Sequence, residues 1–443
     1  MNSIKIKTPG LTEAAKVSAL VIGCGDRAVV YANEGCKNLG AMRVDACVDP
    51  DVSKLEMMKK EFGVPAENCF TSIEQALRRG RFCDCIINGT MDKLHVPTTL
   101  PFLEQGYDVL LEKPVCNNET DLFRLRDAAE RNNCRVFVCH VLRYSPFYRK
   151  IKELILSGEI GEVVHINTYE HVGVFLTSVS FVRGKWSRES ECGSSLLLAK
   201  CSHDMDLICW LNGGTRPDTV FSAGGRNFIT PENAPEGAGT KCLVDCPQSV
   251  REQCIFDAKP MYLDNCLLPW YPWQCTGKDY REITEAEKLE SLKTYNRHGQ
   301  CAYKCGGDIV DHQTVSVRFE NGSFATHNVT LSSFRDGRDI FVAGTRGEID
   351  GRADEGRITV RHYDRETSWY NSRVIDVNAD ADSAGSHYGG DRGLMRDFIN
   401  TVAGGELSIS ATTIDDSVTG QLLVFRADES MKTGLPVKFT EPV

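Results

Sequence analysis

The chain has 443 residues, of which 41% are hydrophobic and 25% charged, with a formal net charge of −10. This length is too great for one ordinary core and predicts two domains. The acidic balance argues against a nucleic-acid partner, which usually meets a basic face, and favours a small-molecule ligand. No apolar run of about 18 residues is present, and residues 1–16 lack the apolar segment of a secretory signal, so we expect neither a membrane span nor secretion.

Cysteine usage indicates the compartment. The chain has nineteen cysteines, an odd number that would risk mispairing in an oxidising environment. Several lie in apolar, strand-like runs such as residues 82–87, FCDCII. We interpret most of them as reduced, buried thiols of a cytoplasmic protein.

The first third of the chain begins with a strand pattern over residues 17–22, VSALVI, followed by glycines at 23 and 25. These glycines fit the start of G-x-G-x-x-G, although the last position is Ala28. A helix is expected next, and then a strand that ends in Asp49. Gly23 would allow the tight turn, and Gly25 would let backbone N–H groups approach a pyrophosphate at the helix start.

An acid at the end of the second strand can bind a ribose 2′-hydroxyl and would repel a 2′-phosphate. Asp49 therefore favours NAD over NADP, although Asp49-Pro50 could also be a simple turn. Strand and helix patterns then alternate up to residue 141, which predicts a parallel, doubly wound Rossmann sheet. Ligands bind such sheets at the carboxyl ends of the strands, where several polar residues fall: Thr90, Glu112, Lys113 and His140.

The tripeptide Glu112-Lys113-Pro114 follows the strand pattern YDVLL directly. Lys113 could hydrogen-bond a reacting sugar hydroxyl and stabilise its developing negative charge. Pro114 would fix the local backbone. The competing interpretation is a solvated turn.

In the middle of the chain, residues 195–211, SLLLAKCSHDMDLICWL, predict a helix that carries Lys200 and His203 on one face. Two cationic groups on one face suit an anionic or alkoxide-like intermediate, although His203 could also be a core or surface residue. Residues 163–175 alternate as a strand, with Tyr169 and His171 on one face. These two side chains could line a sugar pocket or simply pack, and Trp186 could stack on a pyranose ring or belong to the core.

Residues from about 227 to 305 read as an insertion that is rich in turns, aromatics and cysteines. A loop-rich segment with few core positions often needs a staple. Four thiolates could hold a structural zinc ion, and free thiols or disulfides are the alternatives. The candidate zinc ligands are Cys242, Cys246, Cys254 and Cys305.

Beyond the insertion, the pattern predicts two strands around Asn321-Gly322 and another pair within residues 339–351. His312 precedes the first of these strands and could face a cleft. His387 precedes a glycine pair and a helix, and it could contact substrate, although loop histidines on surfaces are commoner.

Several segments together resemble the Gfo/Idh/MocA oxidoreductase family: VIGCGDRA, CVDPD, residues 88–115, SGEIGEVVHINTYE, AKCSHDMDLICWLNG and VAGTRGEIDG. The resemblance covers nearly the whole chain. It implies a Rossmann domain over residues 1–142 and an α/β domain over residues 143–443 with a large, mostly antiparallel open sheet. It also implies NAD as cofactor, a sugar or cyclitol substrate, and a homodimer or homotetramer.

Residue by residue, the resemblance implies cofactor positions at Gly23, Gly25, Arg27, Asp49, Thr90, His95, Glu112 and Lys113. Lys113 looks like the family's catalytic lysine and His203 like its catalytic or substrate-binding histidine. Many sugar dehydrogenases of the family carry an aspartate where this chain has Ala199, and Lys200 is the candidate to replace it. The substrate-binding candidates are Arg143, Tyr144, Tyr169, His171, Trp186, His312 and His387.

Three functions are compatible with this sequence. The leading hypothesis is an NAD-dependent oxidoreductase that removes a hydride from a hydroxyl-bearing sugar carbon. The second is an NAD-dependent glycoside hydrolase that oxidises C3 transiently, eliminates the aglycone, adds water and returns the hydride. The third is a non-catalytic NAD-binding sensor, against which Lys113 and His203 argue.

Overall fold

The computed structural model describes residues 16–378, 381–383 and 385–440; the segment in which no secretory signal is expected lies almost wholly outside them. The chain forms two compact units. The first runs to Lys150 and includes Val377–Val418, and the second comprises Ile151–Asp376 and the residues from Thr419 onward. The expected boundary at residue 142 places every later residue in the second domain, whereas residues 377–418 pack with the first.

The first unit is built on one parallel sheet. In the part of the chain that the structure describes, this sheet has six strands in the order β3-β2-β1-β4-β5-β6. The central strand β1 is buried along its whole length, as expected where helices cover both faces. The predicted Rossmann sheet is confirmed. Its strands are β1 (Val17–Ile22), β2 (Met42–Val48), β3 (Cys69–Phe70), β4 (Cys85–Asn88), β5 (Asp108–Leu111) and β6 (Val136–Val138).

Two of the connecting helices begin at capping side chains. The Asp51 side chain accepts the Ser53 N–H at the start of α2, and the Asn118 side chain accepts the Asp121 N–H at the start of α5. The helices of this region are α1 (Asp26–Asn33), α2 (Val52–Phe62), α3 (Ile73–Leu77), α4 (His95–Leu103), α5 (Glu119–Arg131) and α6 (Pro146–Leu156), with the short η5 (Val141–Tyr144) after β6.

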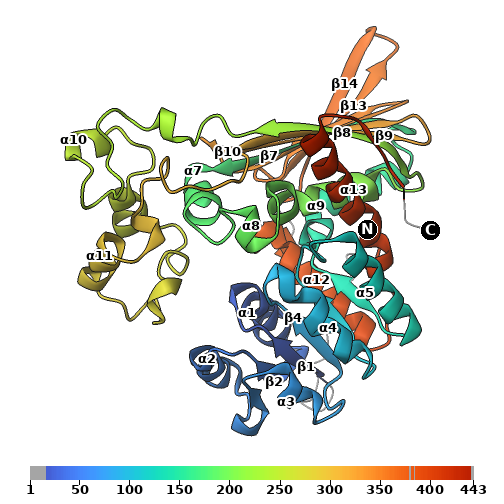
Figure 1. Ribbon diagram of the computed structural model, residues 1–443. Helices are drawn as coiled ribbons and strands as arrows, with labels where there is room; N and C mark the ends of the chain where they lie inside the picture. The colour runs from blue at the N-terminus through green and yellow to red at the C-terminus, as the bar shows by residue number, and fades with distance from the viewer. Residues whose placement is uncertain (1–15, 379–380, 384, 441–443) are drawn as a thin grey trace. The chain divides into compact units, whose positions relative to one another are not determined.

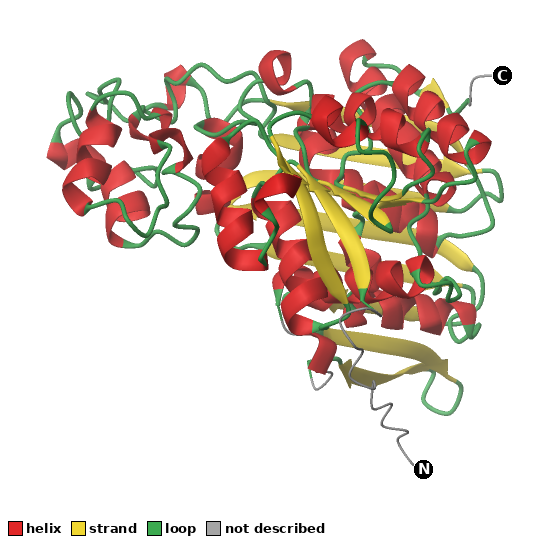
Figure 2. Ribbon diagram, turned by 90° about the horizontal axis from the view of Figure 1, so that it is seen from below, coloured by secondary structure: helices red, strands yellow, loops and turns green. Residues whose placement is uncertain are grey.

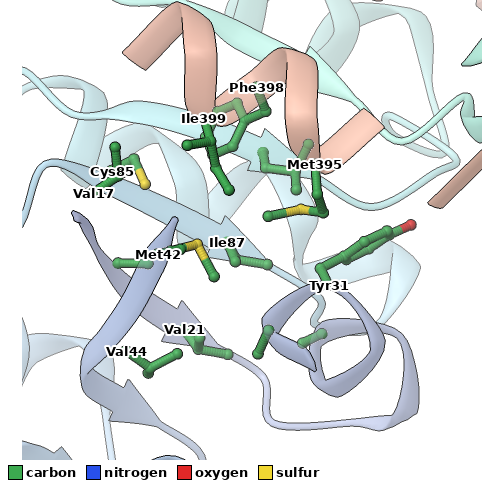
Figure 3. Packing of buried hydrophobic residues seen from close by; sticks show 14 of the residues in the cluster. Val17, Val21, Tyr31, Met42, Val44, Cys85, Ile87, Met395, Phe398 and Ile399 are labelled. Atoms are coloured by element: carbon green, nitrogen blue, oxygen red, sulfur yellow. The ribbon is translucent and has the colours of Figure 1, made fainter. Parts of the chain in front are cut away.

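Helix α12 (Gly390–Val402) explains why a C-terminal segment belongs to the first unit. Met395, Phe398 and Ile399 project from α12 into the cluster formed by the strands (Figure 3). The Phe398 ring meets the Phe137 ring of β6 edge-on, with centroids 5.4 Å apart. Burial of these apolar side chains therefore recruits α12 to the Rossmann core across a long separation in sequence.

The second unit is built on a larger sheet. Its nine described strands have the order β14-β13-β12-β11-β7-β10-β9-β8-β15, and among them only β7 and β10 pair in parallel. The predicted large, mostly antiparallel sheet is confirmed. The strands are β7 (Val163–Gly173), β8 (Pro217–Gly225), β9 (His312–Phe319), β10 (Phe324–Ser333), β11 (Gly337–Gly344), β12 (Glu348–Arg352), β13 (Arg357–Asp364), β14 (Trp369–Asp376) and β15 (Val437–Lys438).

Alternation along these strands gives the sheet two different faces. Even-numbered residues of β7 from Ile166 to Val172 are buried, whereas odd-numbered residues from His165 to His171 are half-buried or exposed. Helix α9 (Leu196–Leu211) contacts the buried face through side chains of β7, β10 and β11. We call the other face the open face. Further helices are α7 (Val174–Leu176), η6 (Thr177–Val182), α8 (Glu189–Cys192) and α13 (Ile414–Thr433).

The insertion lies between β8 and β9 and consists of short helices and loops (Figures 1 and 2). Its helices are η7 (Pro231–Asn233), α10 (Gln248–Arg251), η8 (Lys259–Asp264), η9 (Gln274–Thr276), α11 (Glu285–Lys293) and η10 (Arg297–Gly299). Two apolar clusters hold it together, one around Tyr262 and Trp273 and the other around Phe256 and Tyr303. Across the described residues, no helix combines the length and apolar character that crossing a bilayer requires.

Candidate active site

The turn after β1 has the geometry of a phosphate-binding loop. Gly23 adopts a φ of +74°, and a Cβ there would lie 2.7 Å from the backbone nitrogen of Thr90. Only glycine fits a position that combines positive φ with so close a backbone approach. The Asp49 carboxylate accepts the N–H groups of Cys24 and Asp51, each at 2.9 Å, and so fixes the turn from the end of β2. This cradle, at the start of α1, fits a dinucleotide pyrophosphate.

Ala28 in place of the third motif glycine has a structural explanation. A Cβ on Gly89, at the end of β4, would lie only 2.8 Å from the Ala28 Cβ. The third glycine of the motif serves close helix–strand packing. Here the missing side chain is that of Gly89, so α1 can approach the sheet although position 28 carries a methyl group.

His95 and Thr90 organise the turn that carries Lys113. The His95 ring is buried; its Nδ1 lies 2.7 Å from the Pro114 carbonyl oxygen and its Nε2 lies 3.1 Å from the Thr90 carbonyl oxygen. The Lys113–Pro114 peptide bond is cis. His95 therefore links the ends of β4 and β5, and its ring nitrogens contact protein carbonyl groups.

Glu112 is held by three donors. Its Oε1 accepts hydrogen bonds from Arg27 Nε at 2.8 Å and from the Tyr31 hydroxyl at 2.7 Å, and its Oε2 lies 2.6 Å from the Lys113 backbone nitrogen. Burial alone would raise the pKa of Glu112, but Arg27, followed by Lys113, holds that pKa below its ordinary value. Glu112 is therefore an ionised anchor for the backbone of Lys113.

Arg27 extends this anchor to α12. Its Nη2 lies 2.5 Å from Asp391 Oδ1, and Asp391 Oδ2 lies 3.1 Å from His387 Nδ1. Burial would raise the pKa of Asp391, but Arg27 and then His387 lower it to about 2. We call this set of first-unit residues the edge network: Arg27, Tyr31, Glu112, His387 and Asp391.

No sequence pattern predicts a role for Asp391 or Tyr31 or connects His387 with Arg27. Arg27 and Asp391 are 364 positions apart, and no local spacing relates them. The sequence signal for Asp391 is its place directly after a glycine pair, Gly389-Gly390, at the expected start of a helix.

A second polar network joins α9 to the buried face of the second sheet. Lys200 Nζ lies 2.8 Å from Glu170 Oε1, while Arg338 Nε lies 2.7 Å from Glu170 Oε2 and 2.9 Å from Asp204 Oδ1. His327 Nδ1 lies 2.8 Å from the Thr168 hydroxyl. We call this set the α9 network: Glu170, Lys200, Asp204, His327 and Arg338.

Burial governs the titration of the α9 network. Burial would raise the pKa of Asp204, but Arg338, followed by His327, lowers it. Burial raises the pKa of Glu170 despite Arg338 and Lys200. Burial lowers the pKa of His327 to about 4, so its imidazole is neutral near pH 7. Lys200 is half-buried and pairs with the buried Glu170, and its helix neighbour His203 is buried.

Three predicted substrate residues lie on the opposite side of the sheet from α9. Tyr169, His171 and His312 belong to the open face, because His312 pairs with Thr330, which in turn pairs with His171. The Tyr169 and His171 rings stack at 4.0 Å, and His171 Nε2 lies 3.1 Å from Asp339 Oδ2. The sheet itself separates these residues from Lys200, so the structure does not bring the two groups together.

The remaining substrate candidates make contacts within their own units. Arg143 donates to the Ala411 carbonyl oxygen at 3.0 Å, and the Tyr144 hydroxyl lies 3.2 Å from Thr412 Oγ1; both side chains are buried. Trp186 stacks near Phe181, with ring centroids 6.2 Å apart. These contacts hold the three side chains in place, and their substrate-binding roles stay predictions.

The predicted zinc site in the insertion is not supported. Among the described residues, Cys242, Cys246, Cys254 and Cys305 do not form a metal-ligating group. The Cys242 sulfur lies 3.3 Å from an Arg183 nitrogen, and the Cys305 thiol donates to the carbonyl oxygens of Val182 and Ala302. Because the insertion buries two apolar clusters, it needs no metal staple. All nineteen cysteines, each within the described residues, are free thiols.

One other group in the described residues has suitable ligand types at close range: Cys201, Asp204 and His327, whose ligand atoms lie within 4.8 Å of one another. Arg338 already occupies the Asp204 carboxylate at 2.9 Å. A cation there would have to displace a buried guanidinium, so we assign no metal to this group.

Comparisons with known proteins agree with this architecture. An NAD-binding Rossmann-fold domain of the Gfo/Idh/MocA oxidoreductase family matches residues 17–140, and the family's C-terminal α/β domain matches residues 152–439. A Bacillus subtilis (strain 168) protein, the oxidoreductase YteT, is 26% identical over 371 residues, which are 80% of this chain and 81% of that protein.

Two further relatives carry substrate names. Inositol 2-dehydrogenase of Corynebacterium glutamicum is 23% identical over 194 residues, which are 44% of this chain and 53% of that enzyme. The crystal structure of the WlbA dehydrogenase from Bordetella pertussis, in complex with NADH and UDP-GlcNAcA, is similar with a TM-score of 0.64. That similarity covers 97% of this chain and 99% of WlbA at 16% identity, so it concerns the fold. With both of its domains matched, this chain is an NAD-binding oxidoreductase of the Gfo/Idh/MocA family.

Proposed function

We propose that the protein is an NAD-dependent dehydrogenase that removes a hydride from a hydroxyl-bearing carbon of a cyclitol or sugar. The observation that carries this proposal is the anchoring of Lys113 at the carboxyl edge of the Rossmann sheet by Glu112 and Arg27. A cation held at this edge suits the oxygen of a substrate that is being oxidised. The inositol dehydrogenase relative and the UDP-sugar complex support a polyol or sugar substrate.

NAD, when bound, would supply the hydride acceptor. The turn at Gly23 and Gly25 would hold its pyrophosphate. Glycine is needed at position 23 because a Cβ there would collide with the backbone at Thr90. Asp49 would bind the adenosine ribose and disfavour a 2′-phosphate, which supports NAD over NADP. Lys54 Nζ lies 3.5 Å from the Asp49 carboxylate, so the positive charge of Lys54 is balanced by Asp49.

Lys113 would donate a hydrogen bond to the substrate oxygen and stabilise the charge that develops as the C–H bond breaks. Glu112 would keep its backbone in place. His203 is the second candidate for proton handling, and Lys200 would act through its position on the same helix. Because Glu170 already pairs with Lys200, we expect Lys200 to be a positioning residue.

A redox-assisted glycoside hydrolase remains the second candidate, favoured by one observation. This chain has Ala199 where many sugar dehydrogenases of the family have an aspartate, and Lys200 is committed to Glu170. In such an enzyme the hydride would return to the substrate, so no NADH would accumulate. A non-catalytic NAD-binding sensor is the third candidate.

One assay separates these functions. Purified protein is incubated with NAD and a panel of inositols, free sugars and aryl glycosides, while NADH and released aglycone are followed in the same tube. We expect NADH to accumulate in proportion to a ketone product. Aglycone release without net NADH, with solvent deuterium entering at C2, would replace the proposal with the hydrolase, and neither product would favour the sensor.

We also propose that the protein is a cytoplasmic homodimer or homotetramer that associates through the open face of the second sheet. Phe221, Phe324 and Tyr370 are exposed large side chains that the strand register places on that face. Light scattering with Phe324→Glu tests this assignment. We expect a smaller particle for the variant, and an unchanged particle would contradict the choice of face.

The free thiols support a reducing compartment.

A further inference from the structure

We propose that His387 is the general base of the candidate active site, accepting the substrate hydroxyl proton while Lys113 holds the oxygen. This inference rests on the proposed function and deepens it. It assigns the proton to a residue of the Rossmann unit, which the C-terminal segment supplies, rather than to His203 on α9.

The pairing of His387 with Asp391 orients the imidazole for this role. His387 Nδ1 lies 3.1 Å from Asp391 Oδ2, and the Asp391 side chain is 1% exposed, with Arg27 on its other oxygen. An ionised carboxylate can only accept a hydrogen bond, so Nδ1 carries the hydrogen, and in the neutral ring the lone pair is then on Nε2. A buried aspartate fixes the tautomer of a catalytic histidine in the same way in the Ser-His-Asp triad. The His387 side chain is 32% exposed, which is compatible with access by a substrate.

The backbone around His387 has an energetically unfavourable conformation. His387, Tyr388 and Gly389 have φ values of 50°, 57° and 82°, so three successive residues lie in the left-handed region. A Cβ on Gly389 would overlap the Asp382 carbonyl oxygen, and one on Gly390 would overlap the Val141 carbonyl oxygen. Two non-glycine residues in this region are unfavourable. Such conformations persist where the surroundings enforce them, and they cluster at functional sites.

A continuous set of contacts connects His387 to Lys113 within one unit. It runs from His387 to Asp391 at 3.1 Å, from Asp391 to Arg27 at 2.5 Å, from Arg27 to Glu112 at 2.8 Å, and from Glu112 to the Lys113 backbone nitrogen at 2.6 Å. The proposed base is therefore anchored to Asp391 and the residue that holds the substrate oxygen to Glu112, and Arg27 joins these two carboxylates. A merely structural histidine on a surface loop would not need this connection.

The proposed step balances as follows. The substrate O–H bond breaks and its proton goes to His387 Nε2, while the adjacent C–H bond breaks and its electron pair leaves with the hydrogen, as hydride, to the nicotinamide of NAD. A C=O bond forms from the oxygen lone pair. Lys113 stabilises the charge on oxygen during the transfer, and His387 then releases its proton to water.

Two substitutions at His387 are compatible with its left-handed backbone conformation. Asparagine tolerates the left-handed region, and its amide can donate to Asp391 as Nδ1 does, but it offers no base at the Nε2 position. Glycine also tolerates that region and leaves room for added imidazole. Tyr388→Asn is the matched control, because it places the same residue type at the neighbouring left-handed position.

The experiment measures NADH formation from a polyol that the wild-type protein oxidises, together with NAD affinity by calorimetry. We expect His387→Asn to lower kcat by about 10²-fold or more with unchanged NAD affinity. We expect imidazole to restore activity to His387→Gly, and Tyr388→Asn to stay near wild type. Imidazole rescue distinguishes a lost base from a disturbed fold.

Wild-type kcat in His387→Asn, or loss of activity in His387→Gly that imidazole does not restore, would overturn the inference while the proposed function stands. A wild-type protein that forms NADH from no polyol or sugar would overturn the proposed function and this inference with it.

Discussion

The edge network and the α9 network are built from the same kinds of residue but differ in access to solvent. In the edge network, the side chains of Arg27 and His387 are each 32% exposed, although the carboxylates of Glu112 and Asp391 are buried. In the α9 network, the side chains of Glu170, Asp204 and Arg338 are 3%, 2% and 6% exposed. The first network ends at groups that a ligand can reach, whereas in the second Lys200 is 19% exposed and its partners are enclosed between a helix and a sheet.

This difference separates two uses of buried charge. A fully enclosed ion pair contributes little net stability over an apolar core, but removal of one partner is strongly destabilising. The α9 network therefore fixes the position of α9, and through it that of Lys200. The edge network presents Lys113 and His387 at the carboxyl edge of the Rossmann sheet, where such folds bind ligands. We infer that chemistry belongs to the first network and architecture to the second.

The largest expected effect comes from removing the cation of the proposed site. Lys113→Met keeps the length of the side chain but loses its charge, and we expect kcat for polyol oxidation to fall by about 10²–10³-fold. NAD affinity and the thermal midpoint should change little. Steady-state kinetics with calorimetry checks this, and a variant with wild-type kcat would show that Lys113 lies outside the chemistry.

A matched pair of arginine substitutions tests the division directly. Arg338→Met leaves Glu170 and Asp204 buried without their shared partner, so we expect the free energy of unfolding to fall by about 3–5 kcal/mol. Arg27→Met should lose less, about 1–2 kcal/mol, because solvent reaches that site, but it should impair kcat. Urea unfolding and NADH assays measure both. The reverse ranking of stability losses would contradict the comparison.

The two units should also respond to acid in different pH ranges. Burial lowers the pKa of His327 and of His298 to about 4, below the value of about 6.5 expected when unfolded. The unfolded chain therefore binds protons first, and each histidine contributes stability that is present above pH 6.5 and lost as pH falls to 4, up to about 3 kcal/mol each. Asp391, with its pKa lowered to about 2, contributes stability that is lost only below about pH 4.

Tryptophan fluorescence can follow this difference, because all five tryptophans lie in the second unit. We expect the urea midpoint reported by tryptophan to decline between pH 6.5 and 4, and this decline to be flatter in His327→Asn and His298→Asn. The same pH dependence in the wild-type protein and in both variants would refute the assignment of neutral, buried histidines.

The smallest expected effect concerns metal removal. Because the insertion thiols bond to Arg183 and to backbone carbonyl groups, a chelator should leave the thermal midpoint unchanged. Differential scanning fluorimetry with and without EDTA measures this. A drop of several degrees, with stoichiometric zinc in the purified protein, would reinstate the metal site in the insertion.

Much of the fold could be predicted because its signals are local. Apolar runs such as Val17–Ile22, the turn glycines and the alternation along Val163–Gly173 each fix an element through its own residues. The return of α12 to the Rossmann core could not be predicted in this way. Its apolar face specifies burial but not the partner that covers it.

Some residues of the candidate site could be predicted from local signals and others could not. Gly23, Asp49 and Lys113 follow strand ends, so topology alone brings them to one edge. Asp391 joins that edge only through tertiary packing. Tyr169 and His171 are predicted to line a sugar pocket or to pack, and the sequence cannot choose, because a period of two assigns a residue to a face without saying which face meets α9.

The most direct test of the account is the fate of a labelled hydrogen. Wild-type protein is mixed with NAD and an inositol deuterated at its ring carbons, and the NADH is analysed by mass spectrometry. We expect one deuterium on the nicotinamide, a slower rate with the deuterated substrate, and labelled NADH that forms about 10²–10³-fold more slowly in Lys113→Met. Unlabelled nicotinamide after substrate turnover would contradict the claim that the Rossmann edge carries out hydride transfer.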